Sequence, residues 1–188
     1  RVKIDVHGKE HIPTDQSFVF FPNHQGLFDV LAILEACDVP FSVVAKKEVK
    51  DVPFLKQVFA IMKAKIMDRE DVRQSLTVIQ SVIREVKAGR NYLIFPEGTR
   101  SRNGNQMGQF HSGSFRCATK SKCPIVPVAL VDSFKVLDQK GSKPVTVQIH
   151  YLKPICWEEY GNLKTTELAA LVKERIAQAI QAHTGTEA

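Results

Sequence analysis

The amino-acid sequence predicts an α/β fold, in which helices flank a mixed, largely parallel central sheet. Short apolar runs of strand length alternate along the chain with longer amphipathic segments. The 188 residues are enough for one domain with a substantial core. No repeat, low-complexity tract or linker divides the chain, so we treat residues 1–188 as a single domain.

The first half of the chain is predicted to contain three strands and three helices. The strands are expected at residues 17–21, 41–45 and 65–67, and the helices at 27–37, 53–64 and 71–87. Pro53 suits a first helical turn, where its missing N–H has no partner to lose. The clearest helix, 71–87, carries one apolar face, and Gly89 stands where a left-handed C-terminal cap is expected. That face comprises Val72, Leu76, Ile79, Ile83 and Val86.

The second half is predicted to contribute three more strands and two helices. The strands are expected at 91–95, 125–131 and 145–152, and the helices at 112–122 and 166–183. Strands separated by helices pair in parallel, whereas the last two strands have no helix of comparable length between them. We therefore expect a sheet that is largely parallel and can be mixed.

Composition and charge narrow the class of protein. The chain is 44% hydrophobic and 24% charged, as in globular proteins, and contains no apolar run long enough to span a bilayer. It begins with Arg rather than Met, so we expect a natural N-terminal segment to be absent. A surplus of 26 Lys and Arg over 20 Asp and Glu gives +6, which favours anionic partners. The sequence lacks the basic stripe interleaved with aromatic residues that is typical of nucleic-acid-binding proteins, so we expect no nucleic acid as a partner.

The four cysteines show neither a CxxC pair nor the spacing of a metal site. Isolated cysteines on apolar segments are usually reduced core residues, which indicates a reducing compartment and no bound metal. Four of the histidines look like surface positions: His7, His11, His150 and His183.

The segment NHQGLFD, residues 23–29, falls between a predicted strand and a helix, where α/β proteins place ligand sites. On a regular helix His24 and Asp29 would lie about 140° apart. They can meet only if His24 sits in the capping turn and Asp29 on the first helical turn. A carboxylate on one imidazole nitrogen fixes the tautomer and leaves the other nitrogen as a general base. Taken alone, this spacing is more often a helix cap and a surface charge.

Two further segments follow predicted strands and suit anions. FPEGTRSR, residues 95–102, offers a glycine N–H, two guanidinium groups and two hydroxyls, although alone it could be a polar turn. Arg69, after the short strand 65–67, presents another guanidinium.

Together and in this order, the segments resemble the phospholipid and glycerol acyltransferase family, and most closely its 1-acylglycerol-3-phosphate acyltransferases. The matching blocks are VxGxExIP (6–13), NHQGLFD (23–29), AKKEVKDVPFLKQ (45–57) with MDR (67–69), FPEGTRSR (95–102) and PIVPVAL (124–130). The third block departs from the family at Lys56 and Lys63, where many members have glycine. This departure affects the assignment of the channel for the acceptor and the acyl chain, and does not affect the assignment of the reaction.

The resemblance implies a glycerolipid acyltransferase-like fold and a role for each matching residue. His24 would be the general base, Asp29 its orienting partner, and Lys46 a group near the reacting carbonyl. The residues that would bind the acceptor phosphate and shape the site are Arg69, Glu97, Gly98, Thr99 and Arg100. No cofactor is implied, only acyl-CoA or acyl-carrier protein as co-substrate.

The implied reaction moves a fatty acyl group from a thioester to the free hydroxyl of lysophosphatidic acid. The sequence contains no G-x-S-x-G motif, which would indicate a serine that forms an acyl-enzyme. This agrees with direct transfer of the acyl group. The alternatives are a glycerol-3-phosphate or other lysophospholipid acyltransferase, a hydrolase using the same dyad on water, and a non-enzymatic anion-binding module.

A lysolipid acceptor must enter from a membrane, so we expect an anionic membrane surface as a partner. The helix begun near Pro53 carries one apolar stripe (Leu55, Val58, Phe59 and Met62) beside Lys56 and Lys63. That pattern fits either an interfacial helix or a core helix with a solvated basic face. We expect the protein to be membrane-associated, with its catalytic domain facing the cytoplasm.

Overall fold

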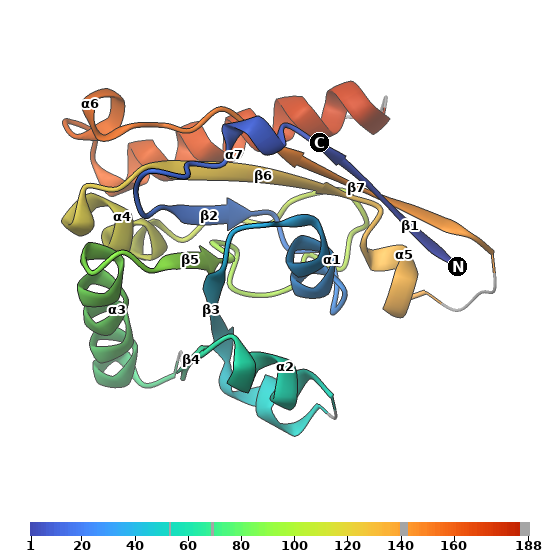
Figure 1. Cartoon of the computed structure of the whole chain (residues 1–188), viewed down its shortest axis with the longest axis horizontal. Coiled ribbons are helices and arrows are strands. Elements are labelled where there is room, and N and C mark those ends of the chain that lie inside the picture. Colours follow the sequence, from blue (N-terminus) through green and yellow to red (C-terminus); the bar gives the residue numbers. More distant parts are fainter. Residues whose placement is uncertain (53, 69, 140–142, 185–188) are drawn as a thin grey trace.

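Within the part of the chain that the computed structural model describes, residues 1–52, 54–68, 70–139 and 143–184, seven strands form one sheet. The spatial order is β1-β7-β6-β2-β5-β3-β4, and helices lie on both faces (Figure 1). The strands are β1 (Val2–His7), β2 (Val19–Pro22), β3 (Phe41–Lys46), β4 (Lys65–Met67), β5 (Asn91–Ile94), β6 (Ile125–Val131) and β7 (Val145–Tyr151).

The predicted mixed, largely parallel sheet is confirmed. The five strands β6, β2, β5, β3 and β4 run parallel to one another, whereas β7 pairs antiparallel with β6. The edge strand β1 pairs parallel with β7, with Val2 opposite Val145. Prediction missed β1, because its alternating charged residues Lys3 and Asp5 resemble a surface segment.

Seven helices and three short 3-10 turns occupy the described residues. The helices are α1 (Asp29–Ala36), α2 (Leu55–Ile61), α3 (Val72–Lys87), α4 (Arg116–Ser121), α5 (Phe134–Leu137), α6 (Trp157–Tyr160) and α7 (Thr165–Thr184). The 3-10 turns are η1 (Lys9–His11), η2 (Lys47–Asp51) and η3 (Ser112–Phe115). Of the helices, only α5 and α6, of one turn each, were not predicted, and the 3-10 turns η1 and η2 were also missed, because three to five residues show too little periodicity to detect.

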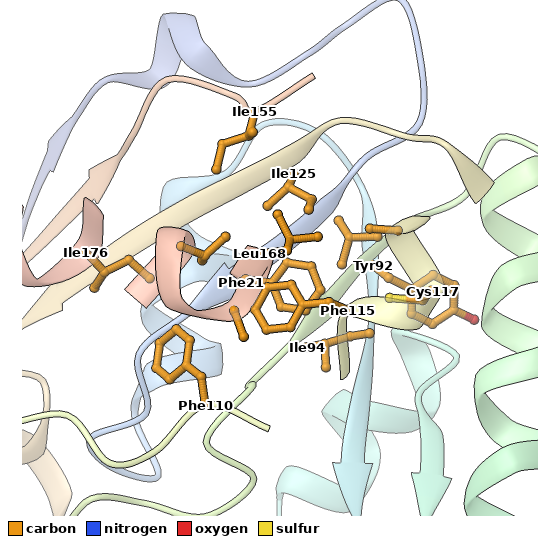
Figure 2. Close-up of a cluster of buried hydrophobic side chains, with 14 of the residues drawn as sticks. Phe21, Tyr92, Ile94, Phe110, Phe115, Cys117, Ile125, Ile155, Leu168 and Ile176 are labelled. Atoms are coloured by element: carbon orange, nitrogen blue, oxygen red, sulfur yellow. The ribbon is translucent and has the colours of Figure 1, made fainter. Parts of the chain in front are cut away.

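The two faces of the sheet form separate parts of the core. Val19 and Phe21 of β2 face a cluster that includes side chains from α3, α4 and α7, part of which Figure 2 shows. Phe18 and Phe20 belong to the cluster on the other face, with side chains from α1 and α2. Burial on both faces explains why the sequence around β2 reads as a continuous apolar run.

The apolar face predicted for α3 is wrong in its first half. Val72 is 69% exposed and Leu76 44% exposed, whereas Val82 and Val86 are buried. Only the C-terminal half of the helix therefore contributes fully buried side chains. Its ends agree with prediction, since Asp71 caps the first turn and Gly89 follows the last turn with φ at +96°.

The apolar stripe of α2 faces the core. Leu55, Phe59 and Met62 are buried, and Val58 packs against the same cluster. Pro53, expected in the first turn, lies outside the described residues. Of the two alternatives predicted for α2, the core-facing helix therefore describes the position of these four apolar residues.

A stack of histidines joins β1, β7 and α7, which corrects the expected surface position of one of them. His150 is 4% exposed, and its ring centroid lies 4.6 Å from that of His7 and 3.8 Å from that of His183. The rings of His7 and His183 lie 6.1 Å apart, so the three imidazoles form one close group at this edge of the sheet.

Candidate active site

The predicted site residues gather where parallel strands end. His24 and Arg100 lie in the loops after β2 and β5, and Lys46 is the last residue of β3; these three strands are neighbours in the sheet. The carboxyl ends of parallel strands meet at one edge, and ligands of α/β proteins bind there. Segments far apart in sequence are therefore brought together by strand order alone.

His24 and Asp29 form the expected pair. Asp29 is the first residue of α1, and its Oδ2 lies 2.8 Å from His24 Nδ1. The same oxygen accepts the backbone N–H groups of Gln25 at 2.6 Å and Gly26 at 3.0 Å. Because this oxygen already accepts two backbone N–H groups, we assign the imidazole proton to Nδ1, which then donates to the same oxygen. Asp29 lies on the first helical turn as predicted, whereas His24 precedes the cap residue Phe28 by four residues.

This arrangement leaves Nε2 of His24 as the proton acceptor. The Asp29 side chain is fully buried, whereas that of His24 is 21% exposed. The imidazole also stacks on Phe95, with ring centroids 3.9 Å apart. A carboxylate on one side and an aromatic face on the other hold the ring in one orientation, as a general base requires.

The backbone of His24 is held by the loop after β5. Its N–H donates to Glu97 Oε1 at 2.7 Å, and its carbonyl accepts the N–H of Ser101 at 2.9 Å. The other oxygen of Glu97 accepts the N–H of Gly108 at 2.7 Å. Burial raises the pKa of Glu97, and the two N–H donors oppose that rise.

Glu97 therefore occupies a different place from the one expected for a phosphate-binding residue. Its side chain is among the buried charged groups of the chain, and each carboxylate oxygen already accepts a backbone N–H. A second anion next to this carboxylate would be repelled. The expectation that Glu97 shapes the site agrees with these contacts, whereas a direct phosphate contact does not.

Two amide side chains of the NHQ segment, to which no role was assigned from the sequence, tie the loop to β6. Asn23 donates from Nδ2 to the carbonyl of Leu130 at 3.0 Å and accepts the Leu130 N–H at 2.7 Å. Gln25 donates to the same carbonyl at 2.9 Å and accepts the N–H of Ser133 at 2.9 Å. The side chain of Asn23 thus continues the backbone pairing of β2 with β6 beyond Pro22. No spacing rule indicates such a partner, because Leu130 is 107 residues away.

The turn after β5 presents the predicted cation. Gly98 has φ at +71°, a conformation that favours glycine, and its N–H donates to Phe95 O at 3.1 Å. Thr99 is exposed and Arg100 half-buried. The Arg100 guanidinium forms an ion pair with Asp138, a residue that sequence reasoning did not identify. Arg69, the other expected phosphate ligand, lies outside the described residues.

One cavity of about 340 Å³ connects these groups. Its polar lining residues include His24, Lys46, Thr99, Arg100 and Arg102. Its apolar lining comes partly from β3, β4, β5 and α3 and partly from α1, α2 and the segment before α2, and includes Val30, Val49, Val52, Leu55 and Phe59. A volume of this size and a wall of this kind suit a ligand with an anionic head and an apolar chain.

A base, several cations and an apolar wall in one cavity describe a site for transfer chemistry on an amphipathic anion. Residues 3–131 match the sequence profile of the family described as Acyltransferase. The chain belongs to this acyltransferase family.

Individual relatives agree with this assignment. The chain is 27% identical over 182 residues to a 1-acyl-sn-glycerol-3-phosphate acyltransferase of Borreliella burgdorferi, covering 96% of this chain and 72% of that protein. It is 29% identical over 175 residues to the enzyme of the same name from Escherichia coli, covering 88% and 71%. A chloroplastic relative from Brassica napus, 28% identical over 183 residues, is covered over 51% of its length. The chain thus spans between about half and three quarters of these relatives.

A solved structure shares the fold. The crystal structure of the 1-acyl-sn-glycerophosphate (LPA) acyltransferase PlsC from Thermotoga maritima superposes with a TM-score of 0.82 at 23% identity, covering 99% of this chain and 74% of that one. The glycerolipid acyltransferase-like fold expected from the resemblance is therefore confirmed.

Proposed function

We propose that this chain is the catalytic domain of a 1-acyl-sn-glycerol-3-phosphate acyltransferase, which converts lysophosphatidic acid to phosphatidic acid. The observation that carries the proposal is the shared cavity, in which His24 and Arg100 line the polar part and apolar side chains line the rest. A lysophosphatidate has a hydroxyl, a phosphate and an acyl chain, and each finds a counterpart there. The names of the relatives support the same substrate.

In the proposed reaction, His24 Nε2 takes the proton of the acceptor's free hydroxyl as that hydroxyl oxygen attacks the acyl donor. The hydroxyl oxygen forms a bond to the thioester carbonyl carbon of acyl-CoA or acyl-carrier protein, and the carbonyl oxygen becomes an oxyanion. When that intermediate collapses, the C–S bond breaks and the thiolate takes the proton from His24. Phosphatidate and a free thiol are the products, and no acyl-enzyme or cofactor is needed.

Lys46 is our candidate for the oxyanion. It ends β3 and lines the same cavity as His24, so its ammonium can reach into the space where the carbonyl would lie. The N–H of Gly98, which could have served instead, already donates to Phe95 O. Arg100 is assigned to the acceptor phosphate, with Thr99 at the same turn and Arg69 as a further cation.

We also propose that the chain works at an anionic membrane surface, with the catalytic domain on the cytoplasmic side. α2 and the residues that flank it carry both exposed apolar and exposed basic side chains: Phe54 is 65% exposed and Ile61 83% exposed, and Lys56 and Lys63 are exposed. Apolar side chains that insert between lipids and lysines that face anionic headgroups both favour interfacial binding. Among the described residues, no helix is long and apolar enough to cross a bilayer.

A single-turnover assay with a thioester donor and lysophosphatidate tests the reaction. Free thiol and phosphatidate in equal amounts are expected. Release of free fatty acid in place of phosphatidate would identify a hydrolase. Absence of thiol release would favour the alternative that the chain binds anions without catalysing a reaction. Glycerol 3-phosphate in place of lysophosphatidate tests the other acceptor class.

A further inference from the structure

Asp138, which directly follows α5 in the connection from β6 to β7, reaches two loops of the candidate site. Its Oδ2 accepts the backbone N–H of Leu27 at 3.1 Å, in the segment that leads into α1. Its Oδ1 forms the ion pair with Nη1 of Arg100, in the turn after β5. One carboxylate therefore links the loop of the base to the loop of the expected phosphate ligand.

The position of Asp138 is fixed by close packing that does not involve Arg100. A Cβ added at Gly26 would lie 2.4 Å from Asp138 Oδ2 and 3.2 Å from Phe134 Cα. A Cβ at Gly104 would lie 3.4 Å from the ring of Phe134. The two glycines thus allow α5 to approach both site loops closely. The N–H of Asp138 also donates to Phe134 O at 3.1 Å, which holds the residue at the end of the helix.

Arg100 lines the cavity that contains His24, whereas Asp138 is not among its lining residues. The carboxylate therefore contacts the guanidinium from behind residues that line the cavity, without lining the cavity itself. A guanidinium has five N–H donors in a rigid plane, and the pair with Asp138 uses the Nη1 end. The remaining donors can serve a phosphate in the cavity.

We propose that Asp138 is a positioning residue that orients the guanidinium of Arg100 toward the phosphate of the acceptor. This inference rests on the proposed function for the identity of the acceptor. A free arginine side chain loses rotamer freedom when it binds a ligand, and an arginine that is already held by a fixed carboxylate loses less. Asp138 therefore increases affinity for a phosphate-bearing ligand without touching that ligand.

The test is calorimetric binding of a short-chain, water-soluble lysophosphatidate to the purified chain. The same compound without its phosphate serves as the ligand control. The variants are Asp138→Ala, Asp138→Asn, Arg100→Ala and the double variant Asp138→Ala with Arg100→Ala. Asp38→Ala removes an exposed carboxylate paired with Lys9 and serves as the matched protein control.

We expect Asp138→Ala to weaken binding of the phosphate-bearing ligand about 5–10-fold, the effect of losing one pre-ordered side chain. Binding of the dephosphorylated compound should not change. Asp138→Asn should retain most of the affinity, because an amide oxygen still accepts from Arg100. The double variant should bind no more weakly than Arg100→Ala, since Asp138 acts through Arg100.

Several outcomes would overturn the inference. Additive losses in the double variant, or equal losses for both ligands, would show that Asp138 acts on the loop at Leu27 instead. Tighter binding in Asp138→Ala would show that the carboxylate competes with phosphate. Arg100-dependent binding without acyl transfer would contradict the proposed function and leave the role of Asp138 supported. A wild-type chain that does not bind the phosphate-bearing ligand would overturn both.

Discussion

Glu97 accepts the backbone N–H of His24 through Oε1 at 2.7 Å, so the candidate base, which follows β2, is held from the loop after the neighbouring strand β5. Asp29 holds the imidazole of the same residue from α1 at 2.8 Å. Two buried carboxylates thus fix His24, one through its main chain and one through its ring. The roles of the two are chemically different, and variants can separate them.

Replacing the base should abolish most activity without unfolding the chain. We expect His24→Ala to lower kcat by at least about 10²-fold, the lower range for a lost general base. Its imidazole is partly exposed, so circular dichroism and thermal unfolding should change little. Asp29→Asn should also impair turnover, because an amide can impose the wrong tautomer and does not stabilise the imidazolium. Near-normal turnover in a folded His24→Ala chain would refute the mechanism.

Glu97→Gln tests positioning through the backbone. Both carboxylate oxygens accept N–H groups, and the amide nitrogen of glutamine would face one of these donors. We expect a loss of about 1–3 kcal/mol in the free energy of unfolding and a lower kcat. The acceptor KM should change less than in Arg100→Ala. Glu158→Gln, at an exposed position, is the control, and a pure KM effect in Glu97→Gln would instead favour direct phosphate binding.

Arg100→Ala should mainly raise the acceptor KM, because a charge-assisted contact to phosphate is lost. Arg69→Ala should act in the same direction with a smaller effect. The informative measurement is the ratio of kcat/KM for lysophosphatidate to that for monoacylglycerol, which lacks the phosphate. Unchanged ratios in both variants would show that neither residue recognises the phosphate.

Vesicle sedimentation tests the membrane proposal. Each lysine near an anionic surface contributes roughly 1 kcal/mol, so Lys56→Glu with Lys63→Glu should weaken binding to anionic vesicles strongly at low salt. Turnover on detergent-dispersed substrate should change less. Lys120→Glu with Lys173→Glu, two lysines of α4 and α7, provides a charge-matched control. Binding that is equal in both pairs would place membrane attachment elsewhere in the protein.

The histidine stack should make stability depend on pH. Burial lowers the pKa of His150 to about 4, with the neighbouring His183 and His7 acting in the same direction and Asp5 in the opposite one. Between pH 6.5 and about 4 the unfolded chain binds a proton at this residue that the folded chain does not, so the free energy of unfolding falls as pH falls. A loss of the order of 1–3 kcal/mol is expected across this window.

Urea unfolding at a series of pH values checks this expectation. His150→Phe keeps a ring in the stack and removes the titrating group, so its stability should fall less below pH 6.5 than that of the wild type. His111→Phe, at an exposed position, should follow the wild type. The same pH slope in all three chains would show that His150 does not titrate as the stack predicts.

The sequence alone determined the alternation of strands and helices and the two chemical motifs. Apolar runs such as that of β6 and the capped periodicity of α3 are local signals, and they placed most elements within a few residues. The meeting of His24 with Asp29 was also a local inference, because five residues and one helix start fix its geometry.

What only the tertiary structure decided concerns contacts between segments distant in sequence. The antiparallel pairing of β7 with β6, the carbonyl of Leu130 between Asn23 and Gln25, and the carboxylate of Asp138 beside Arg100 depend on strand order and close packing. The exposure of Val72 had the same origin, since periodicity defines a face but not how far the core extends along it. Short-range patterns record the geometry of a single element, whereas the partner of a side chain depends on which elements the fold places side by side.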